Sequence, residues 1–220
     1  MKASTVAAKP KSRRKPRTHA QRATATSESI MSAATELFLS QGYANTNLEQ
    51  IATLAGVTKP TVYSHFGSKE KLLRTITDRS AQQRVSTLTG KLTPSDNPRA
   101  DLVRFGNAFL SVVLSDQGSK WERLAASESV DHPEVGAAFY QAGPARVIEL
   151  LRVYLLAQKR AGRLTIPNPA RAAEHLLGLF LGLELLRNRI GHAPKSAAEL
   201  KRHCRECVDL FVRAHGGSPS

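Results

Sequence analysis

The chain has 220 residues, 41% of them hydrophobic, and its 32 lysines and arginines outnumber 18 acidic residues to give a net charge of +14. Two cysteines are too few for a disulfide framework, no apolar run reaches the roughly 18 residues of a membrane span, and no apolar segment follows the charged N-terminus as in a secretory signal. We therefore expect a cytoplasmic protein of one or two domains, whose positive charge favours nucleic acid or an acidic membrane surface as a partner.

The positive charge is concentrated at the start of the chain. Residues 1–22 contain eight basic residues and no acidic one, whereas residues 23–75 contain four of each. Because the first segment has almost no large apolar side chains, we expect residues 1–22 to form a disordered basic tail. Two interpretations of the tail are open: an arm that contacts DNA phosphates or enters a minor groove, and a solubilising extension without a defined contact.

Apolar residues next recur with the spacing of a helix. Ile30, Ala33 and Leu37 fall on one face and predict a helix over about 27–41, which Gly42 would cap. No strand-like alternation extends beyond a few residues anywhere in the chain, so helices are the elements expected throughout.

Two short helices follow the first. Thr46 and Glu49 have the spacing of a capping box at the start of one of them, which would end at Gly56. Thr58 would cap the other, and Pro60 fits its first turn because the missing N–H has no helical partner there.

Residues 46–66 read TNLEQIATLAGVTKPTVYSHF, and we predict a helix-turn-helix over 47–66. The glycine in the turn allows a positive φ, and the alanine and valine beside it let the two helices approach closely. The second helix projects a polar face on which every side chain can donate a hydrogen bond and none is acidic, as suits a helix in the major groove of DNA. This face carries Lys59, Thr61, Tyr63, Ser64 and His65.

The rest of the chain also predicts helices, about nine in total, so the expected fold class is all-α. The remaining helices are expected from Lys69 to about residue 90, over 98–116, 121–130, 131–162 and 168–190, and from Ser196 toward the C-terminus. A kink is expected in the helix over 131–162, at Gly143-Pro144.

The segment from Ile30 to Leu73 resembles the DNA-binding domain of the TetR/AcrR family of bacterial transcriptional regulators. The matching pieces are AATELFLSQGY at 33–43, IATLAGV at 51–57, TVYSHF at 61–66 and SKEKLL at 68–73. Residues from about Arg123 to Leu181 are similar to the C-terminal domains of AcrR-like members.

The resemblance implies a domain organisation and a function. A three-helix DNA-binding domain would occupy residues 23–75, and a helical domain that dimerises and binds a small-molecule effector would occupy residues 76–220. The protein would be a repressor that binds a palindromic DNA operator as a homodimer. The basic tail favours an alternative function, a non-specific nucleoid or membrane-surface binder.

The resemblance also implies which side chains meet DNA. Those expected on phosphates are Tyr63, Lys69, Thr46 and Thr58. Those expected on bases or neighbouring phosphates are Lys59, Pro60, Thr61 and His65. Asn47 stands where the family often has Thr or Ser, so a phosphate contact near it would differ. Pro60 stands where glycine is common, which stiffens the start of the helix.

Two C-terminal segments predict an interface between two copies of the chain. Residues 172–186 are apolar nearly all round, and Gly178 and Gly182 within them permit close helix approach. The last helix places Cys204, Cys207 and Phe211 on one apolar stripe. Packing within a single chain is the alternative for both segments. For the two cysteines, packing is favoured over a redox site, a zinc site or an interchain disulfide.

The candidates for effector binding are aromatic or ionisable side chains of the C-terminal half, each of which has a core or surface position as its alternative. No catalytic motif and no metal-type histidine spacing occurs in the sequence, so we expect no enzymatic activity, metal or cofactor. The main candidates are Phe105, Phe109, Trp121, Tyr140, Tyr154 and His175, with Glu122, Glu128 and His132 as further ones.

Overall fold

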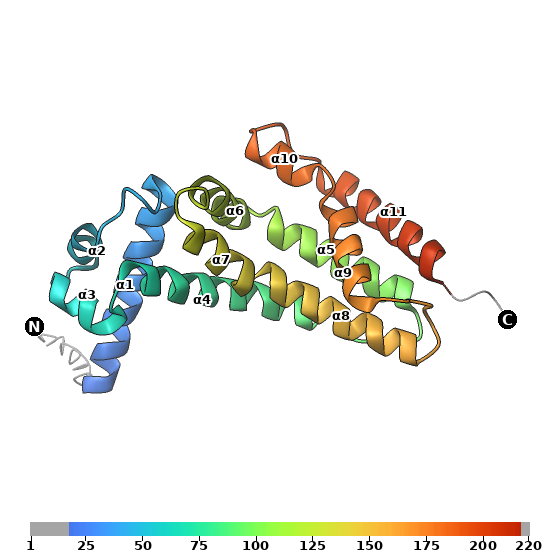
Figure 1. Cartoon of the computed structure of the whole chain (residues 1–220), viewed down its shortest axis with the longest axis horizontal. Helices are drawn as coiled ribbons and strands as arrows, with labels where there is room; N and C mark the ends of the chain where they lie inside the picture. Colours follow the sequence, from blue (N-terminus) through green and yellow to red (C-terminus); the bar gives the residue numbers. More distant parts are fainter. Residues whose placement is uncertain (1–17, 217–220) are drawn as a thin grey trace, which may run out of the picture.

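The computed structural model describes residues 18–216, and this part of the chain consists of eleven helices (Figure 1). The predicted all-α fold class is confirmed, and the only β pairing in these residues is an isolated bridge between Leu164 and Gly216. The helices are α1 (His19–Gln41), α2 (Leu48–Ala55), α3 (Lys59–Phe66), α4 (Lys69–Thr89), α5 (Pro98–Val113), α6 (Asp116–Glu128), α7 (Pro133–Ala142), α8 (Pro144–Arg160), α9 (Pro169–Leu181), α10 (Glu184–Arg189) and α11 (Ala197–His215).

The start of α1 corrects the expected extent of the basic tail. Residues 1–17 of the tail lie outside the described part of the chain, but residues 19–22 belong to α1, which begins well before residue 27. Thr18 caps this helix, because its Oγ1 accepts a hydrogen bond from Gln21 N at 3.3 Å while Gln21 Oε1 accepts one from Thr18 N at 2.9 Å. Ala20, Gln21 and Arg22 of this turn are exposed, and no apolar stripe marked the turn in the sequence.

Two glycines divide segments that were expected to be single helices. The described residues therefore form eleven helices, whereas about nine were expected. Gly143 has φ −115° and ψ −80°, outside the helical region, and Pro144 after it begins α8 because proline cannot donate a helical hydrogen bond. Gly182 has φ 45° and ψ −125°, a conformation that other residues rarely adopt, and it ends α9 before α10.

Buried side chains form two hydrophobic clusters that share α4. The first cluster packs α1, α2 and α3 against the beginning of α4, and we call residues 19–76 the head. Trp121 and Leu124 of α6 and Val135 of α7 are also buried in this cluster. The second cluster joins the end of α4 to α5, α8, α9 and α11. Figure 1 shows α4 running from the head into the C-terminal helices.

A buried carboxylate links the beginning of α5 to α8. Asp101, 1% exposed, accepts hydrogen bonds from Ser95 N at 2.8 Å, Ser95 Oγ at 2.9 Å, Arg104 Nη2 at 2.7 Å and Tyr154 OH at 3.0 Å. Burial alone raises the pKa of a carboxyl group, but here the hydrogen bonds from Ser95, Arg104 and Tyr154 outweigh it and lower the pKa of Asp101 below its ordinary value. The network therefore favours the ionised form of Asp101.

We expect Asp101→Asn to lower the free energy of unfolding at neutral pH by roughly 1–3 kcal/mol, because an amide presents an N–H to groups that need an acceptor. Since the folded-state pKa is depressed, the stabilisation is present above the ordinary carboxyl pKa and is lost as pH falls through the folded-state value. Urea unfolding at neutral and acid pH measures both effects, and the gap between wild type and variant narrows in acid.

Asp209→Asn is the matched control, because Asp209 pairs with Arg99 on the surface, where solvent screens the interaction. An equal loss of stability in the two variants would contradict a special role for the buried network.

Candidate nucleic-acid interface and effector cavity

The helix-turn-helix forms where it was predicted, but its first cap is one residue further along. Asn47 Oδ1 accepts from Glu49 N and from Gln50 N, each at 3.0 Å, and Gln50 Oε1 accepts from Asn47 N at 2.9 Å. Thr46 was expected in this place, but its side chain is buried and its hydroxyl donates to Gly42 O at 2.7 Å. A phosphate contact through the Thr46 hydroxyl is therefore not supported.

The turn between α2 and α3 depends on Gly56, which has φ 69° and ψ 32° in the left-handed region. Ser29 Oγ donates to Ala55 O at 2.9 Å, so α1 holds the last turn of α2 in place. Val62 is fully buried and anchors α3 in the head core. The opposite face of α3 therefore has a fixed orientation toward solvent.

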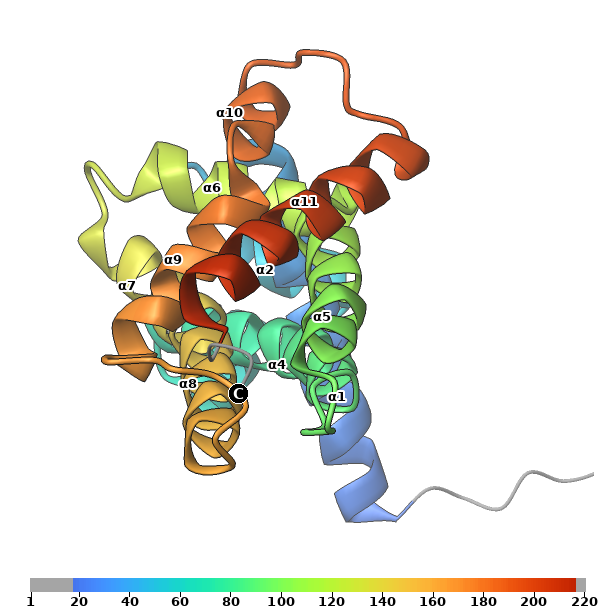
Figure 2. The ribbon, with the colours of Figure 1, turned by 90° about the vertical axis from the view of Figure 1, so that its right-hand side faces the viewer.

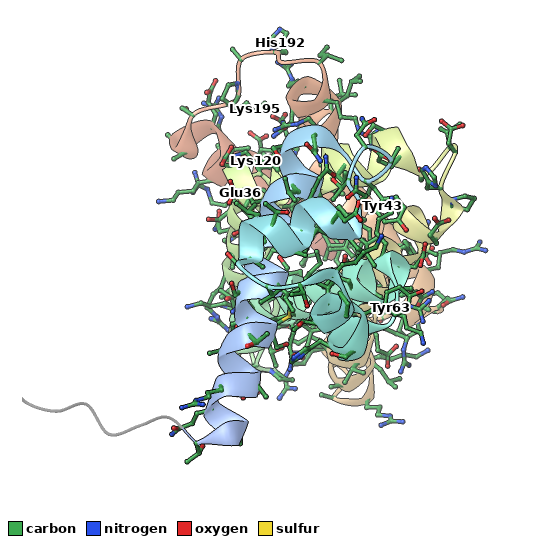
Figure 3. The ribbon with its side chains drawn as sticks, turned by 90° about the vertical axis from the view of Figure 1, so that its left-hand side faces the viewer. Glu36, Tyr43, Tyr63, Lys120, His192 and Lys195 are labelled. Atoms are coloured by element: carbon green, nitrogen blue, oxygen red, sulfur yellow. The ribbon has the colours of Figure 1, made fainter. Side chains whose placement is uncertain are left out.

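The outward face of α3 carries most of the side chains predicted to meet DNA, among them Tyr63 (Figure 3). Thr58 caps the helix: its Oγ1 accepts from Thr61 N at 3.4 Å and lies 2.9 Å from Thr61 Oγ1. Tyr63 is 58% exposed, although aromatic side chains are usually buried. The candidates with exposed side chains are Asn47 and Thr58, which cap α2 and α3, and Lys59, Pro60, Tyr63, Ser64 and His65 of α3 itself, with Thr61 partly exposed.

Two candidate lysines have protein partners. Lys59 Nζ lies 3.2 Å from Glu49 Oε1 in an exposed ion pair, which solvent screens strongly. Lys69 Nζ donates to Tyr43 O at 2.9 Å and to Thr46 O at 3.0 Å, and it lies 4.1 Å from the centre of the Tyr43 ring. Two of its three N–H groups hold the loop before α2, so its main contribution here is to shape that loop.

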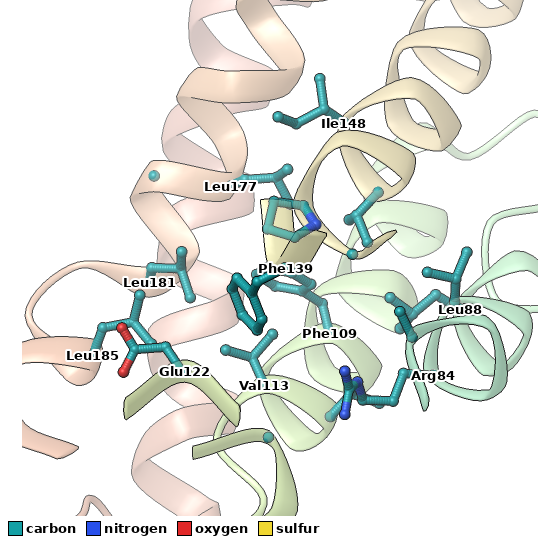
Figure 4. Close-up of a pocket in the computed structure, with 18 of the residues that line it drawn as sticks. Arg84, Leu88, Phe109, Val113, Glu122, Phe139, Ile148, Leu177, Leu181 and Leu185 are labelled. Atoms are coloured by element: carbon teal, nitrogen blue, oxygen red, sulfur yellow. The ribbon is translucent and has the colours of Figure 1, made fainter. Parts of the chain in front are cut away.

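The C-terminal helices enclose a cavity of about 310 Å³, within the usual range of about 300–1,000 Å³ for small-molecule sites (Figure 4). The walls are mostly aliphatic and aromatic. The lining residues are Ala81, Arg84, Val85, Leu88, Phe109, Val112, Val113, Gly118, Glu122, Phe139, Gly143, Pro144, Val147, Ile148, Glu174, Leu177, Gly178, Leu181 and Leu185.

Of the six main effector candidates, the structure places Phe109 in the cavity wall. Phe105 stacks on Phe109 with ring centres 6.0 Å apart but is fully buried behind it. Trp121 is buried in the head cluster instead, because α6 turns that side toward α1. Tyr154 belongs to the Asp101 network.

The two remaining candidates, Tyr140 and His175, are exposed side chains of α7 and α9 and do not line the cavity. Sequence reasoning missed Arg84 and Phe139, although Ala81, Val85 and Leu88 continue the apolar stripe of α4 and could have indicated a second buried face there.

The predicted dimer residues fall into two groups. Cys204, Cys207 and Phe211 are buried within one chain, because their stripe on α11 packs against α5 and α9, so they do not form an interface. Both thiols are free, and burial raises the pKa of Cys204 to about 12, which makes it a poor nucleophile. Gly178 and Gly182 are exposed.

A different set of side chains offers an apolar surface beside those glycines. It includes Leu183, which is 64% exposed, and Ile190, which is 67% exposed. We call this set the apolar face. Its members are Leu179, Leu183, Leu186, Ile190 and Leu210, from the segment α9–α10 and from α11. Figure 2 shows these helices on the side of the molecule that faces the viewer.

Residues 18–216 contain neither a cluster of metal-ligating side chains nor a helix able to span a membrane. No group of three or more His, Cys, Asp or Glu side chains there has an arrangement that could hold a metal ion. No helix in the same residues has the length and hydropathy needed to cross a membrane.

Two family models match the chain. Residues 30–76 match the model described as bacterial regulatory proteins, tetR family, and residues 100–217 match the C-terminal domain of AefR-like transcriptional repressors. Over 108 residues the chain is 30% identical to the HTH-type transcriptional activator FasR of Mycolicibacterium smegmatis, a match that covers 49% of each protein. The match therefore spans about half the length of that curated relative.

Solved structures resemble the chain over nearly its whole length. A putative TetR-family transcriptional regulator from Mesorhizobium loti superposes with a TM-score of 0.79 and 28% identity, covering 89% of this chain and 99% of that one. The flavonoid-responsive regulator FrrA superposes with a TM-score of 0.78 and 25% identity, covering 88% and 98%. FasR and the Mesorhizobium loti protein are described as regulators of transcription, and FrrA is described as a flavonoid-responsive regulator.

Proposed function

The chain belongs to the TetR family of bacterial regulatory proteins, and from this premise we propose that it is a cytoplasmic transcriptional repressor that binds a palindromic DNA operator as a homodimer and responds to a small-molecule effector. One observation carries the proposal: the exposed face of α3 is polar, rich in hydrogen-bond donors and free of acidic side chains, and a buried valine fixes its orientation.

Recognition of DNA by α3 combines two kinds of contact. Lys59 and Tyr63 lie one helical turn apart and reach phosphates or base edges from the same face. A dimer places two such helices in successive major grooves, about 34–36 Å apart, so a palindromic operator mirrors the two-fold symmetry of the protein.

The effector response is supported by side chains that the cavity and the head have in common. On α6, Trp121 and Leu124 are buried in the head cluster, while Gly118 and Glu122 line the cavity. Phe139 of α7 lines the cavity and packs against the head cluster as well. An effector that shifts α6 or α7 therefore repositions the head, and DNA and effector alter each other's affinity by the same factor.

Dimerisation is assigned to the apolar face. Isolated apolar side chains are common on protein surfaces, but several exposed ones gathered along one segment indicate an interaction site. Leu183 and Ile190 flank α10, so the group continues from α9 into the following segment. An interface on α9 and α11 fixes the distance between the two heads, because α9 packs on α8 and α11 packs on α5 and α9 in the second cluster.

We expect Leu183→Glu/Ile190→Glu to convert the dimer into a monomer, because association would bury two unpaired carboxylates from each chain. Light scattering after gel filtration measures the mass, which should fall from twice to once the 23.9 kDa of one chain. Val130→Glu is the control, since Val130 is 81% exposed and lies outside the apolar face. A double variant that stays dimeric would place the interface elsewhere.

A band-shift assay on the DNA upstream of the protein's own coding sequence tests the proposed function. We expect a retarded complex that unlabelled copies of the same DNA compete away and that scrambled DNA of equal length does not. The affinity should also fall steeply with salt, since phosphate contacts release counterions.

The alternative function, a non-specific nucleoid or membrane-surface binder driven by the basic tail, predicts a different outcome in the same assay. Scrambled DNA would then compete as well as the upstream DNA, and deletion of residues 2–17 would abolish binding. Specific retention that survives the deletion supports the operator-binding proposal.

A further inference from the structure

The cavity among the C-terminal helices is apolar apart from three ionisable side chains. These are Arg84 of α4, Glu122 of α6 and Glu174 of α9. A charge at a largely apolar wall is unfavourable unless a partner of opposite charge compensates it. The partners of these three groups therefore indicate which charge an effector has to bring.

The two carboxylates do not need an effector for compensation. Arg189 Nε donates to Glu122 Oε1 at 2.7 Å, and Arg189 Nη2 donates to the same oxygen. Glu174 is exposed to solvent at the rim. Neither group therefore favours a cationic ligand, and a cation at Glu122 would first have to displace Arg189.

Arg84 is in the opposite situation. Its hydrogen bond in residues 18–216 runs from Nη1 to Ser80 Oγ at 3.0 Å, which leaves most of its five N–H donors without an acceptor from those residues. No carboxylate in the same residues forms an ion pair with it, and burial lowers the pKa of the guanidinium below its ordinary value. In Figure 4 the nitrogen atoms of Arg84 point inward from α4, toward Val113, and Glu122 lies on the other side of the cavity.

We propose that the effector is an organic anion, a carboxylate on an apolar body, and that Arg84 holds the carboxylate while the aliphatic and aromatic walls enclose the body. This inference rests on the proposed function, because it names the chemical class of the effector for the same cavity. A guanidinium matches a carboxylate through two parallel N–H···O bonds, and such pairs are stronger than neutral hydrogen bonds.

Uncharged and cationic ligands fit the same cavity less well than a carboxylate. An uncharged apolar molecule would displace water from Arg84 and leave the guanidinium desolvated without a counter-charge. An ammonium group would place a second positive charge in the same low-dielectric space. Of the carboxylate, the uncharged molecule and the ammonium group, the carboxylate is the one that provides a counter-charge for Arg84.

Isothermal titration of the full-length protein with three ten-carbon probes tests the inference. The probes are decanoate, decanol and decylamine, which share one apolar body and differ in charge. At neutral pH we expect decanoate to bind at least about tenfold more tightly than decanol, and decylamine to bind most weakly.

Two variants of Arg84 sharpen the test. Arg84→Gln should weaken decanoate binding at least about tenfold and change decanol binding less than about threefold, whereas Arg84→Lys should retain part of the preference for decanoate. Arg146→Gln is the control, because Arg146 pairs with Asp78 on the surface outside the cavity, and it should leave all three affinities unchanged.

The inference is overturned if decanoate fails to bind, if decanol or decylamine binds as tightly, or if Arg84→Gln leaves decanoate binding unchanged. The band-shift assay on ligand-free protein separates this result from the proposed function. Specific operator retention by protein without any probe keeps the repressor proposal intact, whichever chemical class fills the cavity.

Discussion

Replacing both Lys59 and Tyr63 by alanine is expected to lower operator affinity by roughly 30-fold or more while leaving the fold intact. Both side chains are exposed on α3, and neither contributes to the head core. Specific contacts to bases and charge-assisted contacts to phosphates each contribute about 1–3 kcal/mol to binding. The loss of two such contacts therefore removes most of the preference of one α3 helix for operator DNA over other DNA. In a dimer the loss occurs at both half-sites.

The salt dependence of binding separates the contributions of the two side chains. If Lys59 neutralises a phosphate, the slope of log affinity against log salt concentration decreases by about one for each lost contact, whereas loss of Tyr63 alone leaves the slope nearly unchanged. Fluorescence anisotropy with labelled operator DNA at several salt concentrations measures both quantities.

Lys91→Ala/Tyr140→Ala is the matched control, because it removes the same two residue types at exposed positions far along the chain from α3. It should change neither the affinity nor the slope. If Lys59→Ala/Tyr63→Ala binds operator as tightly as the wild type, α3 is not the recognition helix. Circular dichroism and thermal unfolding confirm that the variants are folded.

Replacing Gly106 by valine is expected to destabilise the protein by roughly 3 kcal/mol or more, equivalent to a fall in Tm of about 6–12 °C for a chain of this size. Gly106 lies on the buried side of α5, where α9 and α11 pack closely. A Cβ atom there would stand 2.6 Å from Cys204 Sγ and 2.6 Å from Phe180 Cζ. Neither neighbour has free space, because both are fully buried.

The consequences extend to assembly, because α9 and α11 carry the apolar face. We expect Gly106→Val to weaken dimerisation along with folding, which gel filtration at decreasing concentration detects. Cys204→Ala should restore part of the lost stability when combined with Gly106→Val, since it opens space at one of the two clashes.

Gly90→Ala is the control that replaces a glycine without a steric clash. The backbone of Gly90 is helical, with φ −69° and ψ −10°, and no atom lies within 4 Å of the position of an added Cβ. Alanine should leave the stability unchanged or raise it by up to about 1 kcal/mol. An equal fall in Tm for both variants would contradict the steric explanation.

The helix-turn-helix was predictable from the sequence because its signals are local. Gly56, the caps around it and the apolar spacing of α2 fall within a few residues of one another. Local signals also misled where two caps competed: Thr46 fits a capping box, but Asn47 forms two backbone hydrogen bonds in its place.

The effector cavity was not predictable in the same way, because it depends on where distant helices meet. Phe105 and Phe109 lie one turn apart on α5, and only the packing of α9 decides which of them reaches the cavity. Arginine is usually a surface residue, so the sequence gives no sign that Arg84 lines a cavity. Its position at the cavity wall follows from the path of α4 through both clusters.

Trp121, Leu124 and Val135 lie far beyond residue 76, yet they complete the hydrophobic cluster of the head. The head is therefore not an interchangeable module that ends with the first turns of α4. A chimaera that joins this head to another regulator at residue 76 would divide one hydrophobic core and expose its apolar surfaces to solvent. A functional chimaera has to include the inward-facing residues of α6 and α7 together with α2 and α3. Because α6 and α7 also line the effector cavity, a change of operator specificity by domain exchange also transfers part of the cavity wall.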